Sequence, residues 1–336
     1  MTEPTTRARS PIVVAVLLAA VAVVLQALLV PLFAAPAANL APRDLPIAVA
    51  GPAPAAEALA ARLAQSRPGA FDLRLLPDPA AADRALRDRE VYAAFVPGPD
   101  GLTLHTATGA SPTVATLLTE AARADGTAVR VVDVVPADPD DPRGTGFAAG
   151  FLPLALVSVL AGALLALFAA GRVARLAGLL TYGVLAGLVG AAVLQGWLGV
   201  LPGDYLSNAS AIGLFALATS AMVTGLGALL GRAGIGLGAF LLFLVGNSLG
   251  AVAAAPELLP RPWGEIGQWL PVGAGSNLLR SAAFFEGAGA LAPLLILAGY
   301  ALLGLLLAVI GRAAIAITQG APADTEESRM LSNSVA

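Results

Sequence analysis

The chain has 336 residues, of which 57% are hydrophobic and 12% are charged, and its mean hydropathy is +0.81. Soluble domains carry about 25% charged residues, so this composition excludes a purely soluble protein and predicts an integral membrane protein. The net charge is −3, all 19 basic residues are arginines and cysteine is absent. These counts exclude disulfides, thiolate metal sites and P-loops, which need a lysine, and no basic tract indicates nucleic acid as a partner.

Runs of about 18 or more apolar residues predict membrane-spanning helices, because the hydrocarbon layer is about 30 Å thick and a helix rises about 1.5 Å per residue. Six such runs occur, and none holds a charged residue in its middle. They cover residues 12–35, 147–171, 177–199, 211–231, 235–255 and 291–311. Ala35-Pro36-Ala37 resembles a signal-peptidase site, but the first run is long for a signal peptide and favours an uncleaved signal anchor.

Arginines flank these runs at alternate ends, and the positive-inside rule assigns such arginines to the cytoplasm. They are Arg7, Arg9, Arg172, Arg175, Arg232 and Arg312. We therefore expect a multi-pass protein with both termini in the cytoplasm. The use of arginine without lysine, with abundant alanine, glycine and proline, is typical of a high-GC bacterial genome and favours a bacterial plasma membrane. The expected divisions are residues 1–35 (tail and first helix), 36–146 (external segment), 147–311 (five-helix domain, with an external element at 256–290) and 312–336 (second tail).

The external segment has the pattern of a small α/β domain. Alternating or short apolar runs predict strands, and apolar residues at helical spacing predict helices. The predicted strands are 45–51, 71–77, 91–97, 102–108 and 128–136, and the predicted helices are 54–65, 79–90 and 111–124. Ser111 is the expected N-cap of the last helix, with Pro112 at its first position. The fold class is thus a polytopic α-helical membrane protein, with six transmembrane helices and an extracytoplasmic α/β domain inserted between helices 1 and 2.

No motif of catalysis or cofactor binding is present. His105 is the only histidine, and we expect it to be an ordinary strand residue. Asp138, Asp140 and Asp141 could hold calcium, but their spacing matches no EF-hand loop, which favours a solvated linker. We expect no enzyme activity, no cofactor and no metal.

Small and polar residues are the main signal inside the predicted spans. Asn247 and Ser248 lie in the middle of the fifth run, and Gln195 lies in the third. A polar side chain in hydrocarbon is costly unless it is hydrogen-bonded, so these three residues either bond to another helix or line a substrate path. Four G-x-x-x-G pairs predict close helix packing. They are Gly183/Gly187, Gly227/Gly231, Gly234/Gly238 and Gly246/Gly250.

The spans lack an internal titratable group, which argues against a proton-coupled carrier. If the protein moves a substrate, we expect the energy to come from another subunit and the cargo to be apolar or amphiphilic. A polar stretch, "WLPVGAGSNLLRSAAFFEG" (269–287), precedes the last span. Its proline and glycines predict a chain that breaks at the membrane surface.

The signal anchor, external α/β domain, five further spans and "LP…R" element together resemble the ABC-2 type transporter permeases, in the YhgE/Pip and SNG1-like branch. "LPIAVAG", "REVYAAFVPGPDGLTL" and "LPVGAGSNLLRSAAFFEG" carry the resemblance. It implies a dimeric exporter subunit for a hydrophobic or lipid-like compound, surrounded by membrane lipids and energised by a separate ABC ATPase.

The resemblance also implies roles for individual residues. The stretch before the last span would re-enter or cap the membrane at the exit of the path, with Pro271, Asn277, Arg280 and Glu286 as exit-element residues. Arg280 would reach headgroups or a carboxylate, and Arg172 and Arg175 would contact the cytoplasmic partner. The cytoplasmic connection 171–178 is shorter than in that family. Two alternatives stay open: an ordinary interfacial helix at 269–287, and a non-transporting envelope scaffold, secretion accessory or phage-recognition protein acting through its external domain.

Overall fold

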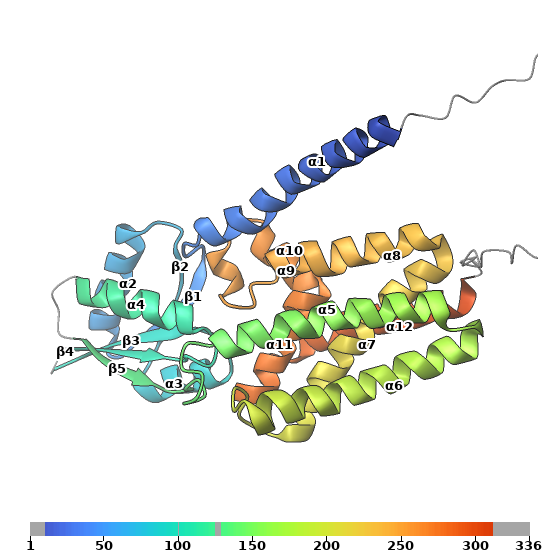
Figure 1. Ribbon diagram of the computed structural model, residues 1–336. Coiled ribbons are helices and arrows are strands. Elements are labelled where there is room, and N and C mark those ends of the chain that lie inside the picture. Colours follow the sequence, from blue (N-terminus) through green and yellow to red (C-terminus); the bar gives the residue numbers. More distant parts are fainter. Residues whose placement is uncertain (1–10, 100, 125–128, 312–336) are drawn as a thin grey trace, which may run out of the picture.

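The computed structural model describes residues 11–99, 101–124 and 129–311 (Figure 1). Within them, six helices are long and apolar enough to cross a membrane. Four of them are single helices: α1 (Pro11–Ala38), α5 (Thr145–Phe168), α7 (Tyr205–Leu230) and α12 (Leu291–Ile310). The third span consists of α6 (Gly171–Ala191) and a π-helical extension to Trp197. The fifth span runs without a break through α8 (Arg232–Gly238), a π-helical segment and α9 (Gly246–Leu249). Two shorter helices, α10 (Trp263–Trp269) and α11 (Pro271–Phe284), precede α12.

Several span boundaries differ from the sequence prediction, including the start of the third span, which lies at Gly171 and not at residue 177. Two of the differences have a clear local cause. The fourth span begins at Tyr205, because Asp204 caps it by accepting a 2.8 Å hydrogen bond from the Ser207 amide. The fifth span ends at Leu249, not at residue 255, because the chain turns at Ala251, whose φ is +52°. Residues 251–255 are all apolar, so hydropathy alone extends the predicted helix through this turn.

The helix α7 lies at the centre of the bundle and contacts α5, α6, α11 and α12. Most of its residues are small, so neighbouring backbones approach closely on several sides. Thr224 donates a 2.9 Å hydrogen bond to the carbonyl oxygen of Gly162 on α5. The other long helices keep leucine and valine side chains exposed, as expected of surfaces that face lipid.

Three of the four G-x-x-x-G pairs lie in helix contacts. A Cβ built at Gly187 would lie 3.0 Å from Cα of Gly213 on α7, and Gly183 faces the same helix. The pair Gly234/Gly238 also packs on α7, and the pair Gly246/Gly250 packs on Val272 of α11. The exception is Gly227/Gly231, because the second glycine has nothing within 4 Å and ends α7 with φ +64°.

The α/β domain lies between α1 and α5 in the chain and has the predicted element order. Its strands are β1 (Leu45–Ala50), β2 (Phe71–Leu76), β3 (Ala93–Gly98), β4 (Gly101–Thr106) and β5 (Val129–Asp133), and its helices are α2 (Ala53–Ser66), α3 (Pro79–Arg87) and α4 (Pro112–Ala124). The sheet order is β2-β1-β3-β4-β5, with β3 and β4 antiparallel and the other neighbours parallel. One core lies between the sheet and α2 and α4, and another lies under α3. Ser111 caps α4 as predicted.

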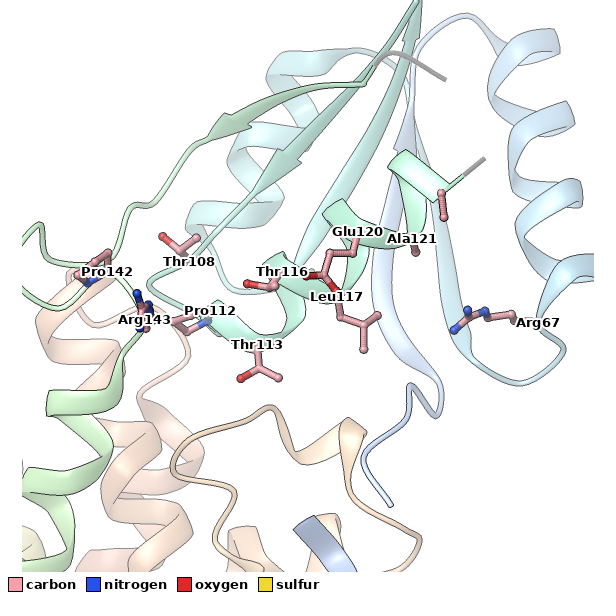
Figure 2. A pocket seen from close by; sticks show the side chains of 11 residues that line it. Arg67, Thr108, Pro112, Thr113, Thr116, Leu117, Glu120, Ala121, Pro142 and Arg143 are labelled. Carbon is pink, nitrogen blue, oxygen red and sulfur yellow. The ribbon is translucent and has the colours of Figure 1, made fainter. Parts of the chain in front are cut away.

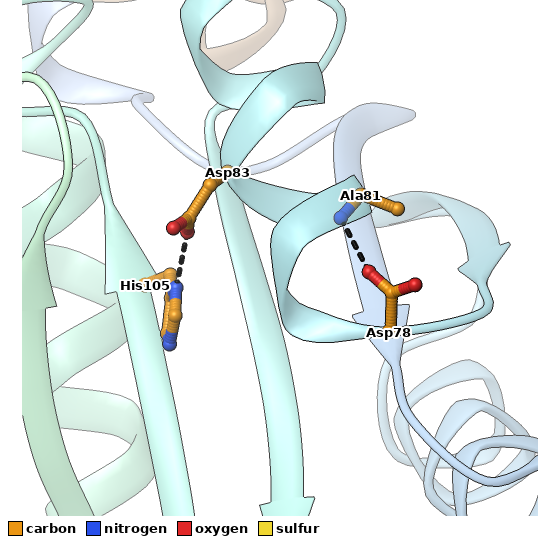
Figure 3. Close-up of polar contacts among 4 residues, drawn as sticks. All are labelled: Asp78, Ala81, Asp83 and His105. Carbon is orange, nitrogen blue, oxygen red and sulfur yellow. Dashed lines mark hydrogen bonds and ion pairs between the residues drawn. The ribbon is translucent and has the colours of Figure 1, made fainter.

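His105 is a strand residue with a structural partner. Its Nδ1 lies 2.6 Å from Oδ1 of Asp83, which joins β4 to α3 (Figure 3). At the start of the same helix, Asp78 accepts a 2.7 Å hydrogen bond from the Ala81 amide. The single histidine is therefore accounted for by the packing of α3 on the sheet.

The start of the first span and the end of the last span both lie far from the sheet. The first residues of α1 and the last residues of α12 lie at the end of the bundle opposite the α/β domain (Figure 1). The helix α1 diverges from the other helices, and only its C-terminal part contacts α9. The predicted tails, residues 1–10 and 312–336 with Arg7, Arg9 and Arg312, lie outside the described residues.

Asp141 is not the solvated linker residue that the sequence favours. Its side chain is only 6% exposed and accepts hydrogen bonds from the Phe147 amide (2.8 Å) and the Thr145 hydroxyl (3.3 Å). These contacts satisfy donors of the first turn of α5, which have no partner within the helix. A carboxylate at a helix N-terminus is also favoured by the helix dipole.

We expect Asp141→Ala to lower the free energy of unfolding by about 1 kcal/mol, the usual loss for a removed cap. The midpoint of thermal unfolding in detergent micelles measures the change. Asp141→Asn is the matched control, because it keeps an oxygen acceptor and should retain most of the stability. Equal midpoints for Asp141→Ala and the native protein would contradict this role.

Candidate functional site

A groove opens on the side of the bundle where α1 ends and α5 begins. We call it the lateral groove. Its volume is about 450 Å³, and its lining is mainly apolar. The walls come from the end of α1, the first turns of α5 and the turn that follows α9; they include Phe33, Leu40, Ala149, Leu152, Val252 and Leu259. The groove thus lies at one end of the spans, on the side of the α/β domain.

Asn247 and Ser248 both line the lateral groove. They lie in the last turn of the fifth span, not in its middle, and a π-helical segment (Ala239–Val245) directly precedes that turn. Such segments occur frequently at functional sites. Ser248 donates a 3.0 Å hydrogen bond to the Val245 carbonyl of its own helix. The half-buried Asn247 amide makes no hydrogen bond to any residue that the structure describes, so it is available to a molecule in the groove.

Gln195 lies elsewhere, at the end of α6. Its Nε2 donates to the Gly203 carbonyl (2.8 Å), and its Oε1 accepts from the buried Asn208 amide (3.0 Å). Both contacts join the end of the third span to the start of the fourth. The structure therefore places Gln195 in a contact between spans and separates it from the two groove residues.

The polar stretch before the last span forms α11, a continuous helix. Pro271 occupies its first turn, where the missing N–H costs nothing. Gly273 faces the Gly267 carbonyl of α10, and Gly275 faces the ring of Phe215 on α7. The chain does break at the proline, because α10 ends at Trp269 and the extended Leu270 separates it from α11. The expected break at the glycines is wrong, because they lie inside α11 and allow close packing of a buried helix.

Arg280 of α11 forms no ion pair with a carboxylate among the described residues. Its Nη2 donates to the Val252 carbonyl (3.1 Å), and its guanidinium lies 4.7 Å from the ring centroid of Phe147. Burial, with nearby Arg89 adding to the effect, lowers the pKa of Arg280 to about 10. Since Val252 lines the lateral groove, Arg280 holds one wall of the groove in place. Glu286 is exposed just beyond the end of α11, with φ +51°.

A chain of hydrogen bonds connects the α/β domain to the groove. Arg89, between α3 and β3, donates to Oδ1 of Asn277 (2.5 Å), to the Asn277 carbonyl (3.3 Å) and to the Ser281 hydroxyl. Asn277 donates to Gln268 of α10, and Gln268 donates to the Gly250 carbonyl, both at 3.3 Å. Gly250 directly follows α9, whose residues line the groove. The chain therefore brings the two predicted groups of site residues, around positions 247 and 277, into one connected network.

Arg89 is the functional candidate that the sequence does not indicate. It follows the two exposed arginines of α3, Arg84 and Arg87, and resembles them in the sequence. Its backbone has φ +60°, an uncommon value outside glycine. Burial lowers its pKa, while Tyr92 and Glu257 act in the opposite direction. Only the folded structure shows that this side chain crosses to α11.

Arg172 and Arg175 lie at the start of α6, at the end of the bundle away from the sheet (Figure 1). Arg172 is exposed, whereas Arg175 is half-buried and its Nε has no hydrogen-bond partner within the described residues. Only residues 169–170 separate α5 from α6. A partner that binds this end of the bundle would therefore find only a short connection between α5 and α6 to contact.

A second, wide pocket of about 710 Å³ lies beside α4 (Figure 2). Arg67, Glu120 and Arg143 supply its charges, and Thr113 donates a 3.0 Å hydrogen bond to the Ala253 carbonyl. Figure 2 shows Arg67 and Arg143 far apart along the pocket. Among the described residues, no three acidic or histidine side chains are grouped as they would be to hold a metal ion.

Comparison of the chain with protein-family models, with curated proteins and with solved structures gave no match. The resemblance to ABC-2 permeases therefore rests on the motifs and span pattern of the chain itself. The chemistry of the site has to be inferred from the lateral groove and the hydrogen bonds around it.

Proposed function

We propose that the protein is a permease-like membrane subunit that exports a hydrophobic or lipid-like compound by way of the lateral groove. The observation that carries this proposal is an apolar groove beside the spans that contains an unpartnered amide, Asn247. Ligand pockets of about 300–1,000 Å³ are typically apolar, with a few polar groups that orient the ligand. The groove, at about 450 Å³, has both properties.

The position of α1 supports access from the lipid. This helix is apolar except for Gln26, and the residues of its first two thirds are exposed. Because it contacts the bundle only near its C-terminal end, membrane lipid can approach the groove from the side. A second copy of the chain would cover this exposed surface, in keeping with a homodimer.

The energy for export would come from a separate ABC ATPase. The middles of the spans carry no charged residue, which argues against coupling to a proton gradient. Exposed Arg172 and neighbouring Arg175 would supply part of the contact with that subunit. This orientation places the α/β domain outside a bacterial plasma membrane and both termini in the cytoplasm.

Filling the groove should abolish its occupation by lipid. The probe is a phospholipid with a photoreactive diazirine in its acyl chain, added to the native protein in nanodiscs, with the labelled peptides located by mass spectrometry. We expect labelling at residues 148–152 and 247–254. In Ala149→Trp this labelling should fall by about tenfold, which corresponds to about 1.4 kcal/mol of binding free energy.

The matched control is Leu160→Trp, which places the same side chain on an exposed position of α5 outside the groove. Its labelling at the groove should equal that of the native protein. If all exposed helices were labelled equally and Ala149→Trp did not change this, the lateral groove would not be a specific lipid site.

Purification through a C-terminal tag in mild detergent tests the transporter assignment. A stoichiometric ATPase that hydrolyses ATP in the complex would support an exporter subunit. Co-purification of envelope proteins without an ATPase would instead favour the scaffold alternative, in which the α/β domain binds a partner.

A further inference from the structure

A third cavity, which the proposed transport does not use, lies where α10 meets the α/β domain. We call it the junction pocket. Its volume is about 540 Å³, and unlike the lateral groove it is lined largely by polar and charged side chains. They include Arg43, Tyr92, Glu257, Arg261, Gln268 and Trp269.

The cation in this pocket is held in place by neutral groups. Arg43 donates hydrogen bonds to the carbonyl oxygens of Leu258 (2.7 Å), Ala41 (3.0 Å) and Asn39 (3.0 Å). Among the described residues, no carboxylate lies within 4.0 Å of its guanidinium. The carbonyls orient the side chain but leave its positive charge without a counter-ion, and they use three of its five N–H donors.

Glu257, one of three carboxylates that line the pocket with Asp44 and Glu265, likewise has no ion-pair partner among the described residues. Glu257 accepts a 3.0 Å hydrogen bond from the Tyr92 hydroxyl, and no arginine that the structure describes lies within 4.0 Å of its carboxylate. Its backbone carbonyl accepts a 3.0 Å hydrogen bond from the Arg43 amide, so the two residues are neighbours across paired segments. Even so, their side chains do not meet. Burial raises the pKa of Glu257, and the hydrogen bond from Tyr92 and the charge of nearby Arg89 offset this cost only in part.

The pocket opens at a surface suited to lipid headgroups. Trp263, Ile266 and Trp269 are exposed along α10. The remaining tryptophan, Trp197, is 80% exposed at the end of the third span, beside the turn that packs on α11. Tryptophans gather at membrane–water interfaces, so all three mark the boundary at this end of the bundle. Arg261 and Asp44 form an exposed ion pair among the lining residues.

We propose that the junction pocket binds the headgroup of a phospholipid that carries both a phosphate and a primary ammonium group, as phosphatidylethanolamine does. The phosphate takes the free N–H donors of Arg43, and the ammonium donates to the carboxylate of Glu257. A ligand with both charges neutralises both side chains at once, whereas a purely anionic lipid leaves Glu257 unpaired. A choline headgroup has no N–H to donate to the carboxylate. This binding does not require the protein to transport anything.

The native protein can be tested with a graded series of lipids. Native mass spectrometry of the full chain in detergent would give the affinity for phosphatidylethanolamine, its N-methyl and N,N-dimethyl forms, phosphatidylcholine and phosphatidylglycerol. The first four lipids lose N–H donors stepwise at constant net charge, whereas phosphatidylglycerol is anionic and lacks the ammonium group. We expect affinity to fall along it, with phosphatidylcholine and phosphatidylglycerol each about tenfold weaker than phosphatidylethanolamine. Equal affinity for all five lipids would overturn the proposal.

Glu257→Gln assigns the selectivity to one residue. In this variant the affinity for phosphatidylethanolamine should drop by about tenfold relative to phosphatidylcholine, so that the two lipids bind equally, because only the ammonium hydrogen bonds separate them. Glu57→Gln, an exposed change on α2, is the charge-matched control and should bind as the native protein does. Selectivity retained in Glu257→Gln would overturn the assignment. If this variant does not fold, the lipid series on the native protein decides alone.

Free phosphoethanolamine distinguishes a lipid site from a site for a small soluble molecule. We expect it not to displace bound phosphatidylethanolamine at equal concentration, because the acyl chains add binding energy beside α10. Displacement by the soluble headgroup at equal concentration would overturn the lipid assignment.

Discussion

Gly275→Leu is expected to lower the free energy of unfolding by about 3 kcal/mol, the upper part of the usual range for overpacking a core. A Cβ at this position would lie 2.9 Å from Cγ of Phe215 and 3.1 Å from Cζ of Phe151. The two rings are already in contact, with centroids 4.7 Å apart, and Phe215 is fully buried. A leucine side chain therefore has to separate α11 from α5 and α7. The midpoint of thermal unfolding and the elution volume in detergent measure the effect.

Gly299→Leu is the matched control, because the same substitution on α12 has nothing within 4 Å of its Cβ. It should leave the midpoint unchanged. Phe215→Ala alone should cost about 3–5 kcal/mol, and its combination with Gly275→Leu should cost less than the sum, since one change makes room for the other. If Gly275→Leu left both the unfolding midpoint and the elution volume unchanged, α11 would not pack against α5 and α7 as described.

The secondary structure of the α/β domain could be predicted because its signals are local. The β1 segment is a short apolar run bounded by glycine, and α4 begins at a serine cap followed by proline. Each such signal depends on a few neighbouring residues. The six spans were predictable for the same reason, because a long apolar run needs no tertiary contact to identify it.

The end of the fifth span could not be predicted from hydropathy. Residues 251–255 are as apolar as a helix in lipid, but here they form a turn in which only Ala254 and Ala255 are buried. The turn is held by contacts that are distant in the sequence, including Arg280 with Val252 and Gln268 with Gly250. Hydrophobicity identifies a buried segment without giving its backbone conformation.

The candidate site was predictable only in part. Asn247 attracts attention because a polar amide is costly in an apolar run, and the structure places it in the lateral groove. The glycines of α11 indicate special backbone geometry, yet either a break or a close contact would need them. Arg89 and Glu257 carry no local signal, since their roles depend on segments more than 150 residues apart. Such pairs become visible only when the fold brings them together.

Arg89→Met is expected to cost about 2–3 kcal/mol of stability and to loosen the connection between the α/β domain and α11. In the native protein the guanidinium of Arg89 lies 5.1 Å from the ring centroid of Phe285. The methionine keeps an apolar side chain near this ring. It removes the donors to Asn277 and Ser281, and hydrogen bonds to charged groups contribute about 1.5–3 kcal/mol. Arg89→Lys keeps the charge without the planar fork and should recover only part of the loss.

Hydrogen exchange gives a readout that a local loss of stability would not produce. If Arg89, Asn277, Gln268 and Gly250 act as one chain, the amides of α11 and of residues 247–252 should exchange faster in Arg89→Met, while those of α6 stay protected. Arg87→Met, an exposed change at the end of α3, is the matched control and should match the native pattern. Faster exchange confined to the α/β domain would show that Arg89 stabilises its own domain and does not reach the groove. Faster exchange at both α11 and residues 247–252 would instead show that Arg89 couples the stability of α11 to that of the lateral groove.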